Sequence, residues 1–118
     1  MNRDCIQIII PSKPEYVSTV RLATSSMASH VGFDVEAIED LRVAISEACN
    51  MMMAGTDIKI EVKIDGNCMQ ITVEKVDQDI QYNTGEREEM GKLILSTLVD
   101  EVEFTGRRIC FKKTVEEP

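Results

Sequence analysis

The feature that most constrains the fold is a pair of alternating apolar runs joined by a tight-turn dipeptide. Apolar side chains occupy every second position in residues 58–64, and the alternation returns in residues 68–76, after Asp65-Gly66. A period of two turns these side chains toward one face of a strand. Glycine supplies the positive φ of a two-residue turn, so we expect an antiparallel hairpin with one buried face. That face needs a layer of helices to cover it.

The segment before this hairpin has the signals of two helices. Ser12 and Glu15 have the spacing of a capping box that would start the first helix. Pro14 would lie in the first turn, where its missing N–H does no harm, and Gly32 is placed to end the helix. The apolar stripe of this helix follows at steps of three and four: Val17, Val20, Thr24, Met27 and Val31.

The second helix is expected to begin at Asp34. An aspartate is a good N-cap, and the acidic residues of the first turns suit the positive end of the helix dipole. We expect this helix to run to about Ala54, with Gly55 as its stop. Its apolar stripe comprises Ile38, Leu41, Ile45, Ala48 and Met52.

The remaining segments complete an α+β pattern. Residues 5–10 form a β-branched run that predicts a strand, and residues 77–87 form a polar loop. Residues 102–105 and 108–114 predict a closing hairpin that turns near Gly106. A third helix is expected between the loop and this hairpin, with a stripe at Met90, Leu93, Ile94 and Leu98. The order predicts a two-layer α/β sandwich, in which three helices cover one face of a mostly antiparallel, mixed sheet.

Composition is that of one globular domain over residues 1–118. Hydrophobic residues make up 43% and charged residues 29% of the chain, and no apolar run reaches the roughly 20 residues of a membrane span. The formal net charge of −8 argues against nucleic acid and favours a protein partner. Four scattered cysteines and one histidine lack metal-ligand spacing. We therefore expect no metal site and a reduced, cytoplasmic setting.

Three segments form a specific pattern: PEYV at residues 14–17 followed by Arg21-Leu22, EDLRVAISEAC at residues 39–49, and TLVDEV at residues 97–102. Together they resemble the serine-kinase anti-sigma factors of the GHKL ATPase superfamily. The resemblance spans nearly the whole chain. It implies a histidine-kinase-like ATPase domain of the Bergerat type, with a shortened lid before the third helix.

The resemblance also implies a set of activities. Such proteins bind Mg-ATP, form homodimers, hold a sigma factor inactive, and phosphorylate a serine of an anti-anti-sigma (STAS-type) antagonist. Arg21 aligns with an arginine of their partner-binding surface, and arginine pairs well with a partner's carboxylate. We expect Arg21 to contact a sigma factor or an antagonist, with an ordinary solvated arginine as the alternative.

The metal-binding motif of the family is only partly present. The family places a glutamate and, four residues later, a magnesium-binding asparagine on one helical face. Glu47 is present, but the next position of the motif is Met51, whose thioether is a poor ligand for a hard cation. Asn50 lies about 100° around the helix from the required place. Glu47 is therefore a catalytic residue, and Asn50 a magnesium ligand, only if the site is active.

The adenine and phosphate motifs also depart from the family. Lys75 and Asp77 stand where the family has Asp-x-Gly, and lysine offers no acceptor to the adenine amino group. Of the phosphate-binding glycines only Gly91 remains, and the carboxylates at residues 88–89 would repel a polyphosphate. Lys75, with Arg107-Arg108, either binds another anion or is solvated surface charge.

The preferred hypothesis is an anti-sigma-factor-like regulator that acts by protein–protein binding, with no cofactor and no kinase activity. Its vestigial nucleotide site would comprise Glu47, Asn50, Lys75, Asp77 and Gly91. The alternative is an active serine/threonine kinase that uses Mg-ATP to phosphorylate an anti-anti-sigma antagonist. A small-ligand sensor, or a subunit that pairs with an active paralogue, is also compatible with these residues.

Overall fold

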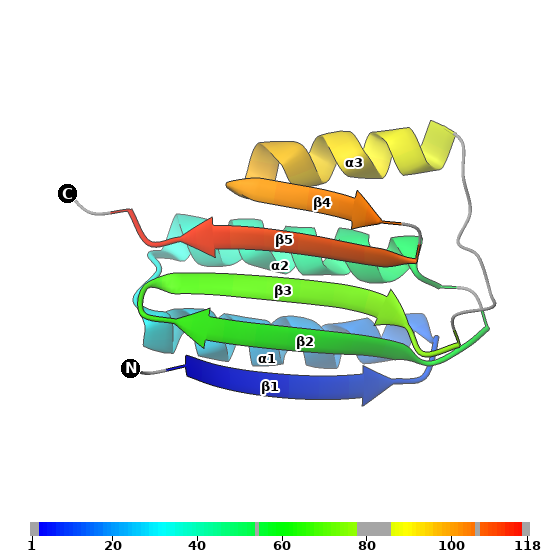
Figure 1. The fold of residues 1–118 in the computed structure, drawn as a ribbon, viewed down its shortest axis with the longest axis horizontal. Coiled ribbons are helices and arrows are strands. Elements are labelled where there is room, and N and C mark those ends of the chain that lie inside the picture. Colours follow the sequence, from blue (N-terminus) through cyan, green and yellow to red (C-terminus); the bar gives the residue numbers. More distant parts are fainter. Residues whose placement is uncertain (1–2, 54, 78–85, 106, 117–118) are drawn as a thin grey trace.

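The computed structural model describes residues 3–53, 55–77, 86–105 and 107–116, and of residues 86 and 87 only the backbone. The predicted loop and its shortened lid therefore lie largely outside the described residues, as do Ala54 and Gly106. The elements follow the predicted order (Figure 1). They are β1 (Arg3–Ile10), α1 (Pro14–Val31), α2 (Val35–Met51), β2 (Ile58–Asp65), β3 (Cys68–Lys75), α3 (Glu86–Leu98), β4 (Glu101–Thr105) and β5 (Arg108–Thr114).

The strands of the described ranges form one five-stranded sheet in the order β1-β2-β3-β5-β4. Every neighbouring pair is antiparallel. The predicted antiparallel pairing is confirmed, and the predicted mixed character is wrong. The reason is visible in Figure 1: α1 and α2 run in opposite directions, so the chain returns to the end where β1 stops and enters β2 in the reverse sense. A single crossover helix would have been needed for a parallel pair.

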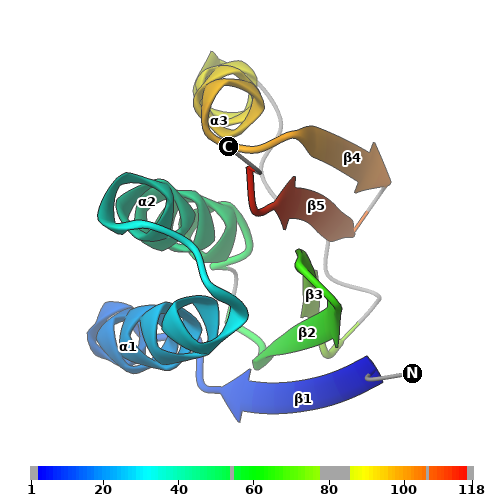
Figure 2. The same cartoon turned by 90° about the vertical axis from the view of Figure 1, so that its left-hand side faces the viewer.

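The helices form one layer and the sheet forms the other (Figure 2). α2 lies between α1 and α3 and contacts both. Within the described residues, all three helices lie on the same face of the sheet, as the two-layer sandwich requires. The hairpin of β2 and β3 turns at Gly66, whose φ of 62° is the positive value expected of this turn.

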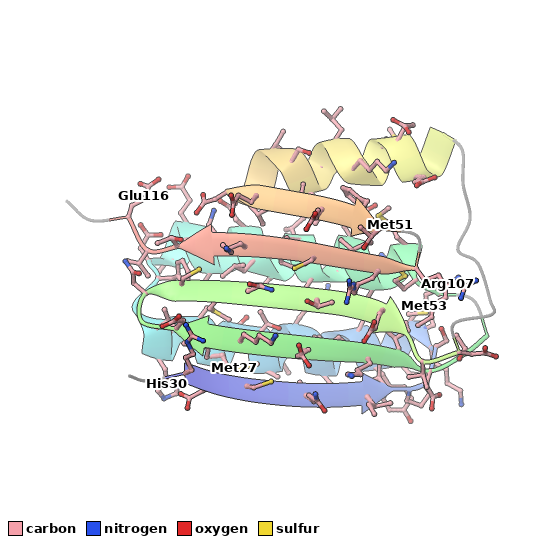
Figure 3. The ribbon with its side chains drawn as sticks, in the orientation of Figure 1. Met27, His30, Met51, Met53, Arg107 and Glu116 are labelled. Carbon is pink, nitrogen blue, oxygen red and sulfur yellow. The ribbon has the colours of Figure 1, made fainter. Side chains whose placement is uncertain are left out.

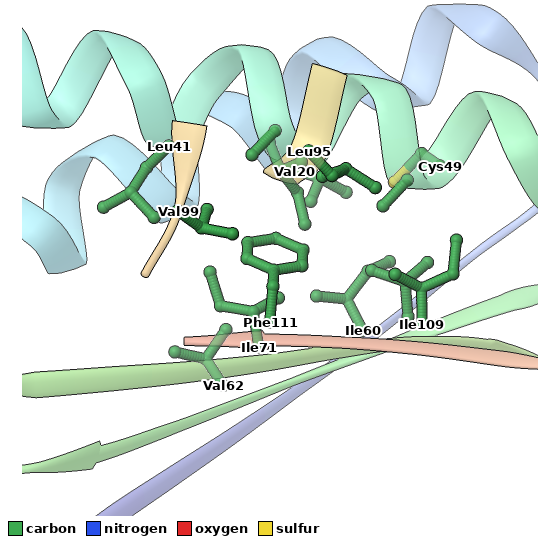
Figure 4. Close-up of a cluster of buried hydrophobic side chains, with 14 of the residues drawn as sticks. Val20, Leu41, Cys49, Ile60, Val62, Ile71, Leu95, Val99, Ile109 and Phe111 are labelled. Atoms are coloured by element: carbon green, nitrogen blue, oxygen red, sulfur yellow. The ribbon is translucent and has the colours of Figure 1, made fainter. Parts of the chain in front are cut away.

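The core lies between these two layers (Figure 4). Phe111, Ile60 and Ile109 project from the sheet toward the helices, and all three are buried. Leu41 and Cys49 of α2 meet them and are fully buried. Burial of one such aliphatic or aromatic side chain contributes about 1.5–3 kcal/mol. The central position of α2 in the helical layer therefore rests on its continuous buried face.

The boundary between α1 and α2 agrees with the cap residues predicted for it. Gly32 adopts a φ of 110°, and its N–H donates to the carbonyl of Ala28 at 3.2 Å. Asp34 Oδ1 accepts from the N–H of Ala37 at 2.8 Å. Both residues satisfy backbone groups that a helix end leaves without an internal partner.

Two other predicted boundaries are wrong. α1 begins at Pro14 with Lys13 as its N-cap, and this residue makes no side-chain cap hydrogen bond, so the capping box predicted from Ser12 and Glu15 is wrong. Proline suits the first helical position whatever precedes it, because its fixed φ is helical and its missing N–H is not needed there. α2 ends at Met51 rather than at Ala54. Its last turn tightens, and the N–H of Met52 donates to the carbonyl of Cys49 at 3.0 Å.

The predicted apolar stripe of α3 is wrong at Met90 and Leu93, which are 67% and 66% exposed. Ile94 and Leu98 of the stripe are half-buried, and Leu98 packs against the core. The fully buried positions are Gly91 and Leu95 on α3 and Val99 directly after it, at steps of four. A glycine carries no hydrophobic signal, so the pattern of large apolar residues pointed to the neighbouring row. In the part of the chain that the structure describes, no helix has both the length and the apolarity needed to cross a membrane.

Candidate functional site

The residues predicted for the vestigial site gather at one end of the molecule. The last turn of α2, the end of β3, the start of α3 and the start of β5 all lie at the right-hand end of Figure 1. Met51, Met53 and Arg107 mark this end in Figure 3. The fold therefore brings together segments that are far apart in the sequence.

Glu47 and Met51 lie on the same side of α2, because residues four apart share a face of a helix. This side faces α3. A Cβ atom placed on Gly91 would lie 3.0 Å from Oε1 of Glu47 and 2.6 Å from Sδ of Met51. Asn50 is exposed and does not share this face. The structure thus brings Glu47, Met51 and Gly91 together and turns the amide of Asn50 toward solvent.

Lys75 ends the central strand β3 and is fully buried. Its interpretation as a solvated surface charge is wrong. Burial lowers the pKa of Lys75 below its ordinary value, and the nearby charge of Arg107 lowers it further. Arg107 is half-buried and Arg108 is exposed, so the three cations do not form one evenly accessible group.

Asp77 lies just beyond the end of β3, and its side chain is exposed. Its backbone N–H donates to Oγ1 of Thr56 at 3.1 Å, and the neighbouring N–H of Val76 donates to the carbonyl of Asp57 at 2.8 Å. These two bonds hold the end of β3 against the segment that precedes β2.

The first turns of α3 carry the two acidic residues expected to repel a polyphosphate. Nζ of Lys92 lies 3.3 Å from Oε1 of Glu88 and 3.8 Å from Oε1 of Glu89. The same ammonium group lies 5.3 Å from the ring centroid of Phe104 on β4. Lys92 therefore offsets part of the negative charge that the two glutamates bring to this helix.

Arg21 lies on the surface between α1 and α2, where it contacts Ser46, the residue before Glu47. Its guanidinium donates from Nη2 to Oγ of Ser18 at 3.2 Å and from Nη1 to Oγ of Ser46 at 3.5 Å. The side chain is half-buried. It lines a shallow surface cavity of about 240 Å³, whose lining residues are Arg21, Glu39, Arg42, Val43 and Ser46.

Residues 10–113 match the histidine kinase-like ATPase domain. The chain belongs to this family. Its relatives include the serine-protein kinase RsbW of Listeria monocytogenes serovar 1/2a, which is 35% identical over 122 aligned positions that cover 84% of this chain and 78% of the relative. RsbW of serotype 4a of that species is 37% identical with the same coverage. RsbW of Bacillus subtilis is 48% identical over 48 residues, which cover 41% of this chain and 30% of the relative.

These comparisons confirm the family that the motifs indicated. The aligned region is longer than this chain, so the Listeria relatives contain residues that this histidine kinase-like ATPase domain lacks. The name serine-protein kinase assigns these relatives a kinase activity. Sequence reasoning missed the burial of Lys75 and the contact of Met51 with Gly91. The sequence offered no signal for the contact, because a glycine has no side chain to show which face of its helix is buried.

Proposed function

We propose that this domain is an anti-sigma-factor-like regulator that acts by binding other proteins, and that its nucleotide site is degenerate. The observation that carries the proposal is the contact of the Met51 thioether with Gly91. In the family pattern an asparagine amide stands at this position of α2, next to the helix that carries the phosphate-binding glycines. Here an apolar side chain occupies that position and packs against the one glycine that remains.

The polar groups around this contact do not fit Mg-ATP. Mg²⁺ prefers oxygen ligands in an octahedral arrangement, and a thioether does not supply one. Asn50 has a suitable amide oxygen but is exposed. It does not lie on the face of α2 from which Glu47 contacts Gly91 of α3. Glu47 alone does not make a magnesium site.

The adenine end of the site supports the same proposal. The buried Lys75 replaces the carboxylate that would accept a hydrogen bond from the adenine amino group, and an amine brings donors where an acceptor is needed. We therefore propose that the domain uses no nucleotide cofactor and has no kinase activity.

The competing function is an active serine/threonine kinase. The name of the RsbW relatives, serine-protein kinase, favours this kinase function, and so does the presence of Glu47 beside Gly91. That function would require Asn50 to turn into the site and Met51 to leave it. Both changes act against the packing of α2 on α3 described above.

The proposed partners are a sigma factor, an anti-anti-sigma protein of the STAS type, or both, with the domain acting in the bacterial cytoplasm as a homodimer. Arg21 is the proposed partner-binding residue. Its guanidinium is held by Ser18 and Ser46 at the edge of a surface cavity, and Leu22 next to it is 67% exposed. A positioned arginine beside exposed apolar surface suits a partner helix that carries a carboxylate.

Calorimetric titration with Mg-ADP tests the nucleotide part of this proposal. We expect no binding heat up to millimolar nucleotide. RsbW of Bacillus subtilis, titrated in parallel, is the control for a family member with an intact site. Binding in the low-micromolar range would reject the degenerate site and favour the kinase.

Affinity capture from the native cytoplasm, followed by identification of the bound proteins, tests the partner part. We expect Arg21→Ala to weaken the recovered complex by about tenfold or more, because truncation of a central arginine at an interface costs 2 kcal/mol or more. Arg3→Ala is the matched control: Arg3 pairs with Asp65 on the sheet and lies away from the α1–α2 surface. Equal affinities of the wild type and the Arg21 variant would remove Arg21 from the interface.

A further inference from the structure

α2 and α3 approach each other through a glycine. A Cβ atom at Gly91 would lie 2.6 Å from Sδ and 3.3 Å from Cε of Met51, and 3.0 Å from Oε1 of Glu47. A Cβ essentially never lies within 3.0 Å of a non-bonded heavy atom, so a larger residue here would push the Met51 thioether out of its place against α3. The closest atoms belong to Met51, and its thioether fills the space that the missing side chain leaves.

The position of Gly91 in α3 explains why this contact matters. Gly91 begins the buried row that continues with Leu95 and Val99, and it lies where α3 faces the last turn of α2. Glycine inside a helix lowers helix stability relative to alanine. We therefore expect the loss of helix stability at this glycine to be offset by an interaction that only glycine allows. The fit of the Met51 thioether supplies that interaction.

We propose that Met51 and Gly91 form an interhelical lock, and that Met51 is the residue that closes the space between Glu47 and α3 to nucleotide. The proposal rests on the degenerate site proposed above, and it assigns the closure to one side chain. Glu47 and Met51 flank Gly91 from one face of α2, so a group that binds between Glu47 and α3 must displace the thioether. Displacement breaks the packing of α2 on α3, and this cost opposes binding.

A double-mutant cycle tests the lock without any nucleotide. The four proteins are the wild type, Gly91→Ala, Met51→Ala and the double variant, each measured by urea unfolding. We expect Gly91→Ala to lower the folding equilibrium constant about tenfold or more in the wild-type background, because it overpacks the contact. In the Met51→Ala background the same change should be neutral or stabilising, since Sδ and Cε are gone.

Additive effects of the two substitutions would overturn the lock. If Gly91→Ala does not fold at all, restoration of folding by Met51→Ala supports the lock, and a double variant that stays unfolded overturns it. Ser96→Ala on the exposed side of α3 is the control for helix propensity, and we expect less than about a twofold change there.

The role in nucleotide exclusion has its own test. Met51→Asn removes the thioether and puts an amide four residues after Glu47. It is compared within a Lys75→Asp background, because Lys75 would otherwise still oppose adenine. We expect Met51→Asn to raise the affinity of the Lys75→Asp variant for Mg-ADP by about tenfold or more, and equal affinities would overturn the closure role. Lys75→Met is the second background if Lys75→Asp does not fold.

The two tests separate the two proposals. Tight Mg-ADP binding by the wild type would reject the degenerate site even if the double-mutant cycle shows coupling. A wild type that binds no nucleotide, together with additive stabilities in the cycle, would keep the degenerate site and reject the lock.

Discussion

The thiol of Cys49 lies in the core on α2, where burial raises its pKa from 9.0 to about 12. Burial disfavours the charged form of any group, so it raises the pKa of a thiol and lowers the pKa of an amine such as Lys75. Arg107 adds to the effect on Lys75. At the residue scale, therefore, burial moves the pKa of each of these side chains in the direction that favours its neutral form.

We predict that ionisation of Cys49 lowers stability at high pH. Below about pH 9 the thiol keeps its proton in both the folded and the unfolded state, so the free energy of unfolding does not change with pH through this group. Between about 9 and 12 only the unfolded state loses the proton, so the free energy of unfolding falls by up to about 1.4 kcal/mol per pH unit. Urea unfolding of the wild type and Cys49→Ala at several values from about pH 8 to 10 measures this slope.

Cys49→Ala should show a shallower fall. The lowered pKa of Lys75 acts in the opposite direction, because its contribution grows as the pH approaches the unfolded pKa of 10.5. The contribution of Lys75 is the same in the wild type and in Cys49→Ala, so it cancels in the difference between their slopes. Identical slopes for the two proteins would show that Cys49 ionises as easily in the folded state as in the unfolded one.

The element whose orientation matters most for the site is α3. Gly91 faces α2 and Leu95 lies in the core, while Met90 and Leu93 point to solvent. This rotation is what places Gly91 against Met51. With Leu93 on the buried row instead, a large side chain would face α2 and the close approach of the two helices would be lost.

The two neighbouring leucines of α3 give a matched test of this orientation. Leu95 is fully buried and Leu93 is 66% exposed. We predict that Leu95→Ala lowers the free energy of unfolding by about 2–5 kcal/mol, because it leaves a cavity in the core. Leu93→Ala should change it by no more than about 0.5 kcal/mol. Urea unfolding compares the two variants directly, and a reversed order would mean that the other face of α3 is buried.

Over the residues that the structure describes, the molecule is a sheet with its helices on one side. The bare side is kept compatible with water by charged residues in cross-strand pairs, such as Lys59 with Glu74 at 3.6 Å and Lys112 with Glu101 at 3.6 Å. Such exposed pairs each contribute little to stability, about 0–1 kcal/mol. Stability therefore comes mainly from the face that meets α1, α2 and α3, with β3 at the centre of the sheet.

This arrangement predicts a gradient of amide hydrogen exchange across the sheet. β3 has hydrogen-bonded neighbours on both sides, whereas β1 and β4 each have one. We expect the slowest exchange at buried residues of β3 such as Ile71 and Val73, and faster exchange on the outward-facing amides of β1 and β4. Amide exchange followed by NMR provides the measurement. Stronger protection in β1 than in β3 would mean that β1 is covered in solution by something beyond this chain.

The sequence by itself determined the features that depend on neighbouring residues. The Asp65-Gly66 hairpin, the Asp34 cap and the Gly32 helix end are correct because their signals lie within a few residues of the structure they specify. The departures of Lys75 and Met51 from the family pattern were also readable, because each is a change of residue type at a motif position.

Only the tertiary structure decided how these local pieces meet. The burial of Lys75 and the buried row of α3 depend on segments tens of residues apart. Gly91 is the clearest case, because a glycine has no side chain to reveal which face of its helix is buried. The atoms that define its place belong to Met51 and Glu47, which reach it only when α2 and α3 pack together.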